Sequence, residues 1–394
     1  MKIVVLGGGI STERSVSLVT ATSVCRALRD AGHKAIFVDM FLGLENYTGR
    51  LEDAFDAPDG FCGSVSISET APDLEAVKAS RRLKSPSHLG VGVLDICALA
   101  DCVFLGLHGI DGEDGKIQAA LELLGVPYTG SGPLGSAMAM DKAVAKRIME
   151  SAGILTPKWR EITYTADDVP ALVQELPVPC VVKAVDGGSS IGVSLPDTRE
   201  QLEQALYDVL RYGRRIVVEE KIVGREFTQP VLGDDYLSTI QIVPPEGSTF
   251  DYVAKYQSGA AAARELCPAP CTEEEHRLLG ETALKLHHAL GLSVYPRRLH
   301  FGRGGPPLVS GGQHPPRHDP QQPYPQGRQG GRHDVSGALR EDRVPVSGKI
   351  RKPQPTSAEE NKRRPLGRLF FTFPPVYPAF LPCPAAPRRH SPIL

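Results

Sequence analysis

The strongest constraint on how this chain can fold is a change of composition at Tyr295. Residues 1–295 carry 27 Lys and Arg against 40 Asp and Glu, whereas residues 296–394 carry 17 against 6. The second segment also holds 19 of the 34 prolines, and after Phe301 no helical or strand period persists. We therefore expect residues 1–295 to build the cores and residues 296–394 to form a disordered tail. A basic, nucleic-acid-binding arm is the first interpretation of that tail.

The composition of the whole chain excludes several classes of protein. Its 394 residues, 41% hydrophobic with a net charge of −2, are enough for two or three soluble domains. The eight cysteines contain no CxxC pair, so we expect free thiols in a reducing cytoplasm. Asp95 and Asp101 interrupt the most apolar stretch, and the apolar start is too short for a signal peptide, so no membrane segment is expected.

Two segments of the first 130 residues have the pattern of ligand loops in an α/β sheet. Residues 2–6 are an apolar run that ends in three glycines, followed by a helical pattern and a second apolar run at 35–38. The glycine loop lacks the GxGxxG order because Thr12 holds the third place, so a plain tight turn and a ligand loop both remain open. A buried strand at 102–107 leads into the polar, glycine-rich segment 108–115, which is either a ligand loop at the strand's carboxyl end or an acidic surface turn.

Lysines and glycines further along the chain suit a bound phosphate. Lys142 and Lys146 share one helix face, with solvated lysines as the alternative. A strand ends at Lys183, and the Gly/Ser loop at 186–193 follows it without the Walker order, so a phosphate cradle and a plain hairpin are both open. A further strand at 216–222 ends in carboxylates. Lysines that reach into one cleft from two β-rich layers would suit a nucleoside triphosphate.

Taken together and in order, six motifs resemble the D-alanine–D-alanine ligases of the ATP-grasp superfamily. They lie at residues 8–17, 107–115, 127–132, 140–142, 188–192 and 254–256. The resemblance implies an α/β chain with a Rossmann-like pre-ATP-grasp domain at 1–130. An ATP-grasp fold would follow, with a central subdomain at 131–212 and a C-terminal subdomain at 213–295 that is incomplete after about residue 295.

The resemblance also implies an activity and its requirements. Such enzymes join two D-alanines for peptidoglycan precursors, by passing the γ-phosphoryl group of ATP to one D-alanine and letting the second amine attack the acyl phosphate. Catalysis is then mainly positioning and charge neutralisation. The implied cofactors are ATP with Mg²⁺ or Mn²⁺, and the implied partner beyond D-alanine is a second copy of the chain, with no nucleic acid and no membrane.

Site residues are carried over from the matching motifs. Glu13 would hold the ammonium of the first D-alanine, with His108 near the same pocket. Ser189 and Tyr256 would join Glu13 in a hydrogen-bonded set that closes the site, and Tyr256 favours D-alanine over D-lactate as the second substrate. The residues expected at ATP are Lys142, Lys183 and Lys255 on the phosphates, Glu219, Glu220 and Ile222 at the adenine hinge, and Glu226 on the ribose. Ala184 replaces the usual proline after the lysine, a change of little expected effect.

The resemblance stops after Leu292, where relatives continue with R-V-D-F and later L-E-x-N-T. The chain instead reads Tyr295-Pro296-Arg297-Arg298, and the family's metal-binding Asp, Glu and Asn are missing. Joining the last two bases of each codon to the first base of the next restores both motifs: residues 296–301 permit R-V-D-F-I, and residues 310–329 permit L-E-V-N-T. We infer that the chain is out of frame from about Pro296, through two lost bases or one added base.

This shift in frame changes what is expected of the tail and of the activity. The basic composition then reflects GC-rich DNA in the wrong register, so the nucleic-acid interpretation becomes weak. Without its metal ligands the chain should be inactive, and without the strands that close the ATP-grasp core it should aggregate. A non-catalytic nucleotide-binding remnant or pseudogene product, and another ATP-grasp carboxylate–amine ligase, are the alternatives.

Overall fold

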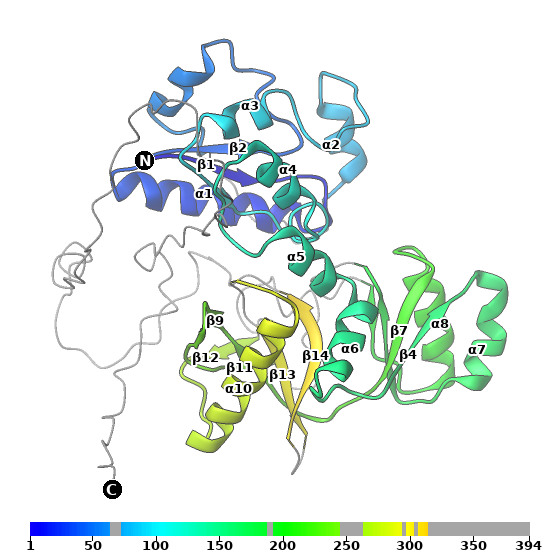
Figure 1. Cartoon of the computed structure of the whole chain (residues 1–394). Helices are drawn as coiled ribbons and strands as arrows, with labels where there is room; N and C mark the ends of the chain where they lie inside the picture. Colours follow the sequence, from blue (N-terminus) through cyan, green and yellow to red (C-terminus); the bar gives the residue numbers. More distant parts are fainter. Residues whose placement is uncertain (64–71, 187–191, 245–262, 294–296, 303–305, 314–394) are drawn as a thin grey trace, which may run out of the picture.

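The computed structural model describes residues 1–63, 72–186, 192–244, 263–293, 297–302 and 306–313. Three sheet-containing units follow one another along the chain, in blue to cyan, in green, and in yellow-green to yellow in Figure 1. The predicted α/β class is confirmed. Among the helices that the structure describes, none has the length and apolar character needed to cross a bilayer.

The first unit is built around a fully buried parallel strand. β1 (Lys2–Gly7) lies between β2 (Lys34–Asp39) and β3 (Cys102–Leu105), and residues 3–6 are 0% exposed because helices and loops cover both faces. α1 (Arg14–Asp30) packs so closely on β1 that a Cβ on Gly7 would lie 2.4 Å from the Cβ of Ala21. Only glycine allows this approach.

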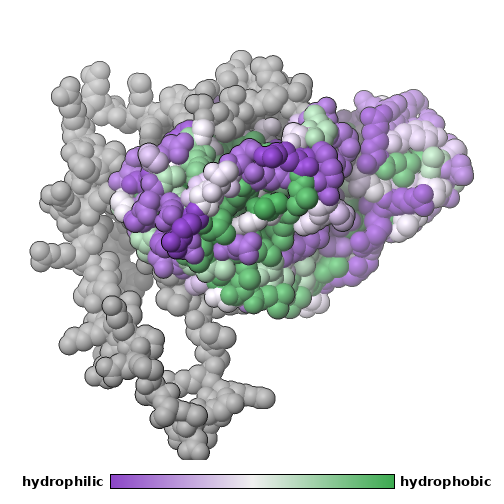
Figure 2. All heavy atoms as spheres, turned by 90° about the horizontal axis from the view of Figure 1, so that it is seen from above, coloured by the Kyte–Doolittle hydropathy of each residue, from purple (hydrophilic) through white to green (hydrophobic). Residues whose placement is uncertain are grey.

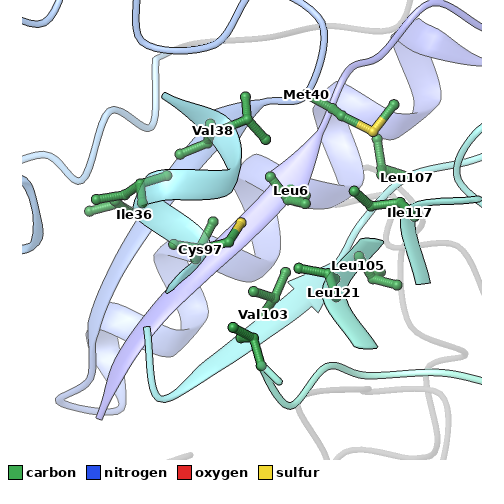
Figure 3. Packing of buried hydrophobic residues seen from close by; sticks show 14 of the residues in the cluster. Leu6, Ile36, Val38, Met40, Cys97, Val103, Leu105, Leu107, Ile117 and Leu121 are labelled. Atoms are coloured by element: carbon green, nitrogen blue, oxygen red, sulfur yellow. The ribbon is translucent and has the colours of Figure 1, made fainter. Parts of the chain in front are cut away.

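The opposite face of the first sheet carries the larger apolar core. Figure 3 shows side chains of β1, β2 and β3 meeting those of the covering helices. These elements are η1 (Leu51–Asp56), α3 (Val93–Ala98) and α4 (Lys116–Leu124), while α2 (Leu74–Ser80) lies in the same unit without a buried residue. Leu6, Cys97 and Leu121 are among the fully buried residues of this cluster.

The second unit is an antiparallel sheet with two helices on one face. α5 (Pro133–Met140) and α6 (Lys142–Ser151) lead into it from the first unit. The strand order is β4 (Trp159–Thr163), β7 (Arg215–Glu220), β5 (Cys180–Ala184) and β6 (Val193–Ser194). The helical elements are η2 (Ala166–Asp168), α7 (Val169–Glu175) and α8 (Arg199–Val209). Since β7 pairs with β4 and β5, the sheet boundary lies after Glu220 and not at the expected 212.

The third unit is a five-stranded sheet on which one long helix packs. Its order is β12 (Arg264–Leu266), β11 (Ile240–Val243), β8 (Gly224–Gln229), β13 (Arg297–Gly302) and β14 (Pro307–Gln313), with the short pair β9 (Val231–Leu232) and β10 (Asp235–Tyr236) beside it. α10 (Glu273–Ala289) begins in a capping box between Thr272 and Glu275. Its buried Leu279 and Leu286 pack in one cluster with Phe227 and Val309.

The expectation that the chain lacks the strands closing this core is wrong for residues 297–302 and 307–313. β13 pairs antiparallel with β8 along its whole length, and β14 pairs with β13. A ladder is made by backbone groups and needs no particular side-chain pattern, while Val309, 1% exposed, supplies an apolar contact to the core. The absence of a strand period in the sequence therefore did not prevent strand formation here. The rest of the expected tail, residues 314–394, lies outside the described residues.

Candidate functional site

The loop after β1 is a rigid turn that places Glu13. Gly8 and Gly9 have φ angles of 69° and 75°, which favour glycine. Arg14 donates to the carbonyl of Gly9 at 2.5 Å and forms an ion pair with Asp39, with 2.5 Å between Nη2 and Oδ2. The turn is thus fixed by its own contacts. Glu13 begins α1 at the carboxyl edge of the sheet and is only 1% exposed.

A second loop, after β3, brings His108 and Glu113 to Glu13. One ligand atom from each of these three buried residues lies within 4.8 Å of the others. Ser11 donates its hydroxyl hydrogen to the carbonyl of His108 at 2.7 Å, and the N–H of Gly109 donates to Glu113 at 2.6 Å. The two loops therefore form one wall, as expected at the carboxyl ends of parallel strands. The alternative of an acidic surface turn is wrong for Glu113, which is 7% exposed.

Two carboxylates and an imidazole in one buried cluster are suited to a cation. A substituted ammonium offers N–H donors that carboxylate oxygens accept, and a divalent metal takes the same oxygens as ligands. Glu113 was not among the expected site residues, although it lies within the glycine-rich segment 108–115. The sequence feature that could have identified Glu113 is its position in that loop, directly after a buried strand.

A cluster of lysines and one carboxylate lies between α6 and the second sheet. Glu219 bridges two lysines: its Oε2 is 2.9 Å from Nζ of Lys183, and its Oε1 is 3.4 Å from Nζ of Lys146. Lys146 also donates to the hydroxyl of Thr156 at 2.5 Å, and Lys183 donates to the carbonyl of Ser310 at 3.0 Å. Lys146 is 1% exposed, so the alternative of a solvated lysine is wrong for it.

Burial weakens the hold of two lysines on their protons. Desolvation and, to a smaller extent, the positive charge of Lys183 lower the pKa of Lys142 to about 8, although the carboxylates of Asp186, Glu219 and Glu13 oppose the shift. Desolvation also lowers the pKa of Lys146 to about 8, against the opposing charge of Glu219. The negative charge of Glu13 thus acts on Lys142, so the carboxylate pocket and the lysine cluster interact electrostatically.

The two glutamates at the end of β7 have different surroundings. Side chains alternate along a strand, and Glu219 is 3% exposed and faces the lysines. Glu220 is exposed and accepts from the backbone N–H of Lys158 at 3.1 Å. The structure thus gives Glu219 the role of a bridge between lysines. The adenine and ribose assignments of Glu219, Glu220, Ile222 and Glu226 remain predictions.

Three of the expected site residues lie outside the described part of the chain. They are Ser189, Lys255 and Tyr256. Their roles remain predictions.

The closing strands do not fit the magnesium site that the resemblance implies. β13 has the sequence R-R-L-H-F-G and β14 has P-L-V-S-G-G-Q, so neither contains a carboxylate. Magnesium at phosphoryl-transfer sites is held by carboxylates together with the substrate's phosphates. These two strands therefore offer no carboxylate ligand to such an ion.

Two family models match most of the chain as far as residue 299. The family described as "D-ala D-ala ligase N-terminus" matches residues 2–131, and the family described as "D-ala D-ala ligase C-terminus" matches residues 148–299. The D-alanine–D-alanine ligase of Lacticaseibacillus casei is 38% identical over 297 residues, which cover 75% of this chain and 82% of that protein.

Solved structures of other proteins share the fold of this chain. The VanG D-Ala:D-Ser ligase of Enterococcus faecalis is 28% identical with a TM-score of 0.55, over 79% of this chain and 89% of that one. The D-alanine–D-alanine ligase of Bacillus anthracis, complexed with ATP, shares the fold at 24% identity and a TM-score of 0.52, over 79% and 85% of the two chains.

Proposed function

Because this chain belongs to the D-alanine–D-alanine ligase family, we propose that residues 1–295 carry the machinery for joining two D-alanines for peptidoglycan precursors. The reaction converts ATP to ADP through a D-alanyl phosphate. The observation that carries the proposal is a pocket of buried carboxylates whose negative charge acts on a second pocket of lysines. Glu13, His108 and Glu113 form the first, and Lys142 and Lys183 belong to the second.

Each pocket suits one part of the reaction. The ammonium of the first D-alanine carries the positive charge that Glu13 and Glu113 complement, and their burial strengthens the attraction. The carboxylate of that D-alanine then points toward the lysines, where the γ-phosphoryl group of ATP is transferred to it. Lys142 and Lys183 lower the repulsion between the two anions and hold them in line. Glu219 fixes Lys183 in place by the contact described above.

Activity of the chain as printed is a separate part of the proposal. The segment 297–313 supplies strands but no carboxylates, so charge neutralisation at the phosphates is incomplete. We expect a folded protein with little or no turnover. The implied Mg²⁺ or Mn²⁺ requirement belongs to the frame-restored chain.

The test compares two chains expressed from one gene. One is the chain as printed, and the other has two bases inserted directly after the codon for Tyr295. ADP formation and the dipeptide product are measured with ATP, a divalent cation and D-alanine, with L-alanine as the control. We expect dipeptide from the frame-restored chain and a rate at least about 100-fold lower from the printed chain.

The other outcomes identify the alternatives. Equal rates from both chains would refute the proposed inactivity. If the restored chain forms ADP only with an amino acid other than D-alanine, the chain is another ATP-grasp ligase, and D-serine is included because one matched structure is a D-Ala:D-Ser ligase. If the restored chain binds ATP but forms no ADP with any amino acid, it is a nucleotide-binding remnant.

The exposed apolar surface favours a second copy of this chain as the partner. Leu123 is 91% exposed at the end of α4, and Leu134 is 71% exposed on α5. Figure 2 shows hydrophobic residues exposed over the middle and lower part of the face seen from above, beside hydrophilic residues. Exposed apolar residues of this kind are typical of interfaces. Sedimentation velocity of the purified chain distinguishes a homodimer from a monomer.

A further inference from the structure

Two cysteines from distant segments meet on the outer side of the first sheet. Cys25 lies on α1 and is 0% exposed, and Cys62 follows the loop after η1 and is partly buried. Both thiols are directed at the same acceptor, with 3.8 Å from Sγ of Cys25 and 3.5 Å from Sγ of Cys62 to the carbonyl oxygen of Gly60. They belong to one apolar cluster with Phe37. The two sulfur atoms are therefore neighbours.

The loop that carries Cys62 is fastened to the helix that carries Cys25. Arg26, the next residue on α1, donates to the carbonyl of Cys62 at 3.1 Å and to that of Gly63 at 2.6 Å. The backbone N–H of Phe37 donates to the carbonyl of Gly60 at 2.8 Å, which ties the turn to β2. Together these contacts hold the two thiols in fixed positions.

Arg29 fastens the start of the same loop. It donates to the carbonyls of Ala57 at 3.0 Å and Pro58 at 2.7 Å, and to that of Ala35 on β2 at 2.8 Å. Phe61 adopts a φ of 61°, a left-handed conformation that is rare outside glycine, and this turns the chain back toward α1. The juxtaposition of the thiols is thus built by several side chains and a strained turn.

The surroundings assign different roles to the two thiols. The contact with the Cys25 thiol lowers the pKa of Cys62, and the positive charges of Arg26 and Arg29 lower it further. The same contact and burial raise the pKa of Cys25. A thiolate is the reactive form. Cys62 therefore reacts first, and Cys25 is the second thiol.

We propose that Cys25 and Cys62 are a redox-active dithiol that hydrogen peroxide converts to a disulfide. The Cys62 thiolate attacks one peroxide oxygen, the O–O bond breaks, and hydroxide leaves, giving a sulfenic acid, while the hydroxide takes a proton from solvent and becomes water. Cys25 then attacks the sulfur of Cys62, the S–O bond breaks, and water leaves as the S–S bond forms. In sum, two thiols lose two hydrogens and one peroxide becomes two waters. The site is separate from the proposed ligase chemistry.

Four other cysteines in the described part of the chain, Cys97, Cys102, Cys180 and Cys271, hold their protons more firmly than an ordinary thiol. Burial raises the pKa of Cys97 to about 12, and of Cys102 and Cys180 to about 11. Burial also raises the pKa of Cys271. Oxidation is therefore expected to be selective for the pair.

The test uses the full-length reduced protein exposed to hydrogen peroxide, followed by alkylation, proteolysis and mass spectrometry without reductant. We expect one cross-linked peptide pair joining Cys25 to Cys62, with the loss of two hydrogen atoms and full reversal by dithiothreitol. In C25S the second step is removed, so Cys62 should accumulate as a sulfenic acid that dimedone traps. C62S should give neither product.

C102S is the matched control, because it removes another buried thiol of the same unit and should keep the cross-link. Two results would overturn the proposal. One is oxidised Cys62 in a chain whose Cys25 is still alkylated, and the other is a cross-link from Cys62 to any other cysteine. The unaltered chain alone decides both, so the test stands even where a variant fails to fold.

Discussion

Thr156 donates a hydrogen bond at 2.9 Å to the carbonyl oxygen of Val309, which lies 153 residues further along the chain. The backbone N–H of Val309 donates in turn to the carbonyl of Leu155 at 3.0 Å, and Lys183 donates to the carbonyl of Ser310 at 3.0 Å. All three contacts use backbone atoms of β14. The strand is therefore held to the second unit by groups that every residue except proline carries in full.

This contact makes Thr156 important for stability. In Thr156→Val, the carbonyl of Val309 loses its donor, and the ammonium of Lys146 loses one acceptor while its contact with Glu219 remains. Buried groups left unpaired cost about 1–3 kcal/mol, and we expect a loss of that size in the free energy of unfolding, measured by urea denaturation. Thr163→Val, at an exposed position of β4, is the matched control. Equal stability of the two variants would show that β14 does not dock as described.

The buried cluster also predicts a dependence on pH. The pKa of Lys146 is about 8 in the folded chain against 10.5 for an ordinary lysine. Between these values the unfolded chain holds a proton that the folded chain has released, so the free energy of unfolding rises with pH. The slope from one such group is at most about 1.4 kcal/mol per pH unit.

Lys146→Met removes this contribution. The unfolding free energy of the unaltered chain minus that of the variant should therefore increase from pH 8 to pH 10, as measured by urea denaturation at each pH. Lys158→Met, which changes an exposed lysine, should give a constant difference. A constant difference for Lys146→Met as well would mean that Lys146 keeps its proton throughout.

The first sheet and its ligand loops could be predicted from the sequence because both depend on local patterns. The buried strand at residues 2–6 and the glycines after it predict the turn that places Glu13. Lys146 and Glu113 were harder to interpret, because charged residues usually face water, and only the packing of other elements buries these two. β14 was missed for a different reason: its ladder and its docking use backbone groups, and these leave no trace in the order of side chains.

Glu13→Gln tests the carboxylate pocket in the frame-restored chain. The variant keeps the shape of the side chain but removes the negative charge that faces the ammonium of the first D-alanine. Loss of one charged hydrogen bond is worth about 1.5–3 kcal/mol, and we expect kcat/KM for D-alanine to fall by about 10- to 100-fold. Glu113→Gln should act in the same direction, whereas Glu52→Gln, on the exposed surface, should leave ADP formation unchanged. An unchanged kcat/KM in Glu13→Gln would exclude Glu13 from the substrate pocket.

The last prediction concerns the reading frame and the strands that it encodes. In the shifted frame the missing Asp arises from the codons of Arg298 and Leu299, and the missing Glu from those of Gly311 and Gly312. These positions lie on β13 and β14, which are paired neighbours in the sheet. The frame-restored chain should therefore gain a carboxylate on each of two adjacent strands, which is what a divalent cation between phosphates requires.

Independent genomic clones sequenced across the codons for Ser293 to Arg298 should show two further bases or one fewer. The restored chain should bind Mn²⁺ in the presence of ADP, and the printed chain should not. Electron paramagnetic resonance measures this binding. Clones that confirm the printed frame would make this chain the natural product of its gene, and equal Mn²⁺ binding by both chains would show that the ligands come from elsewhere.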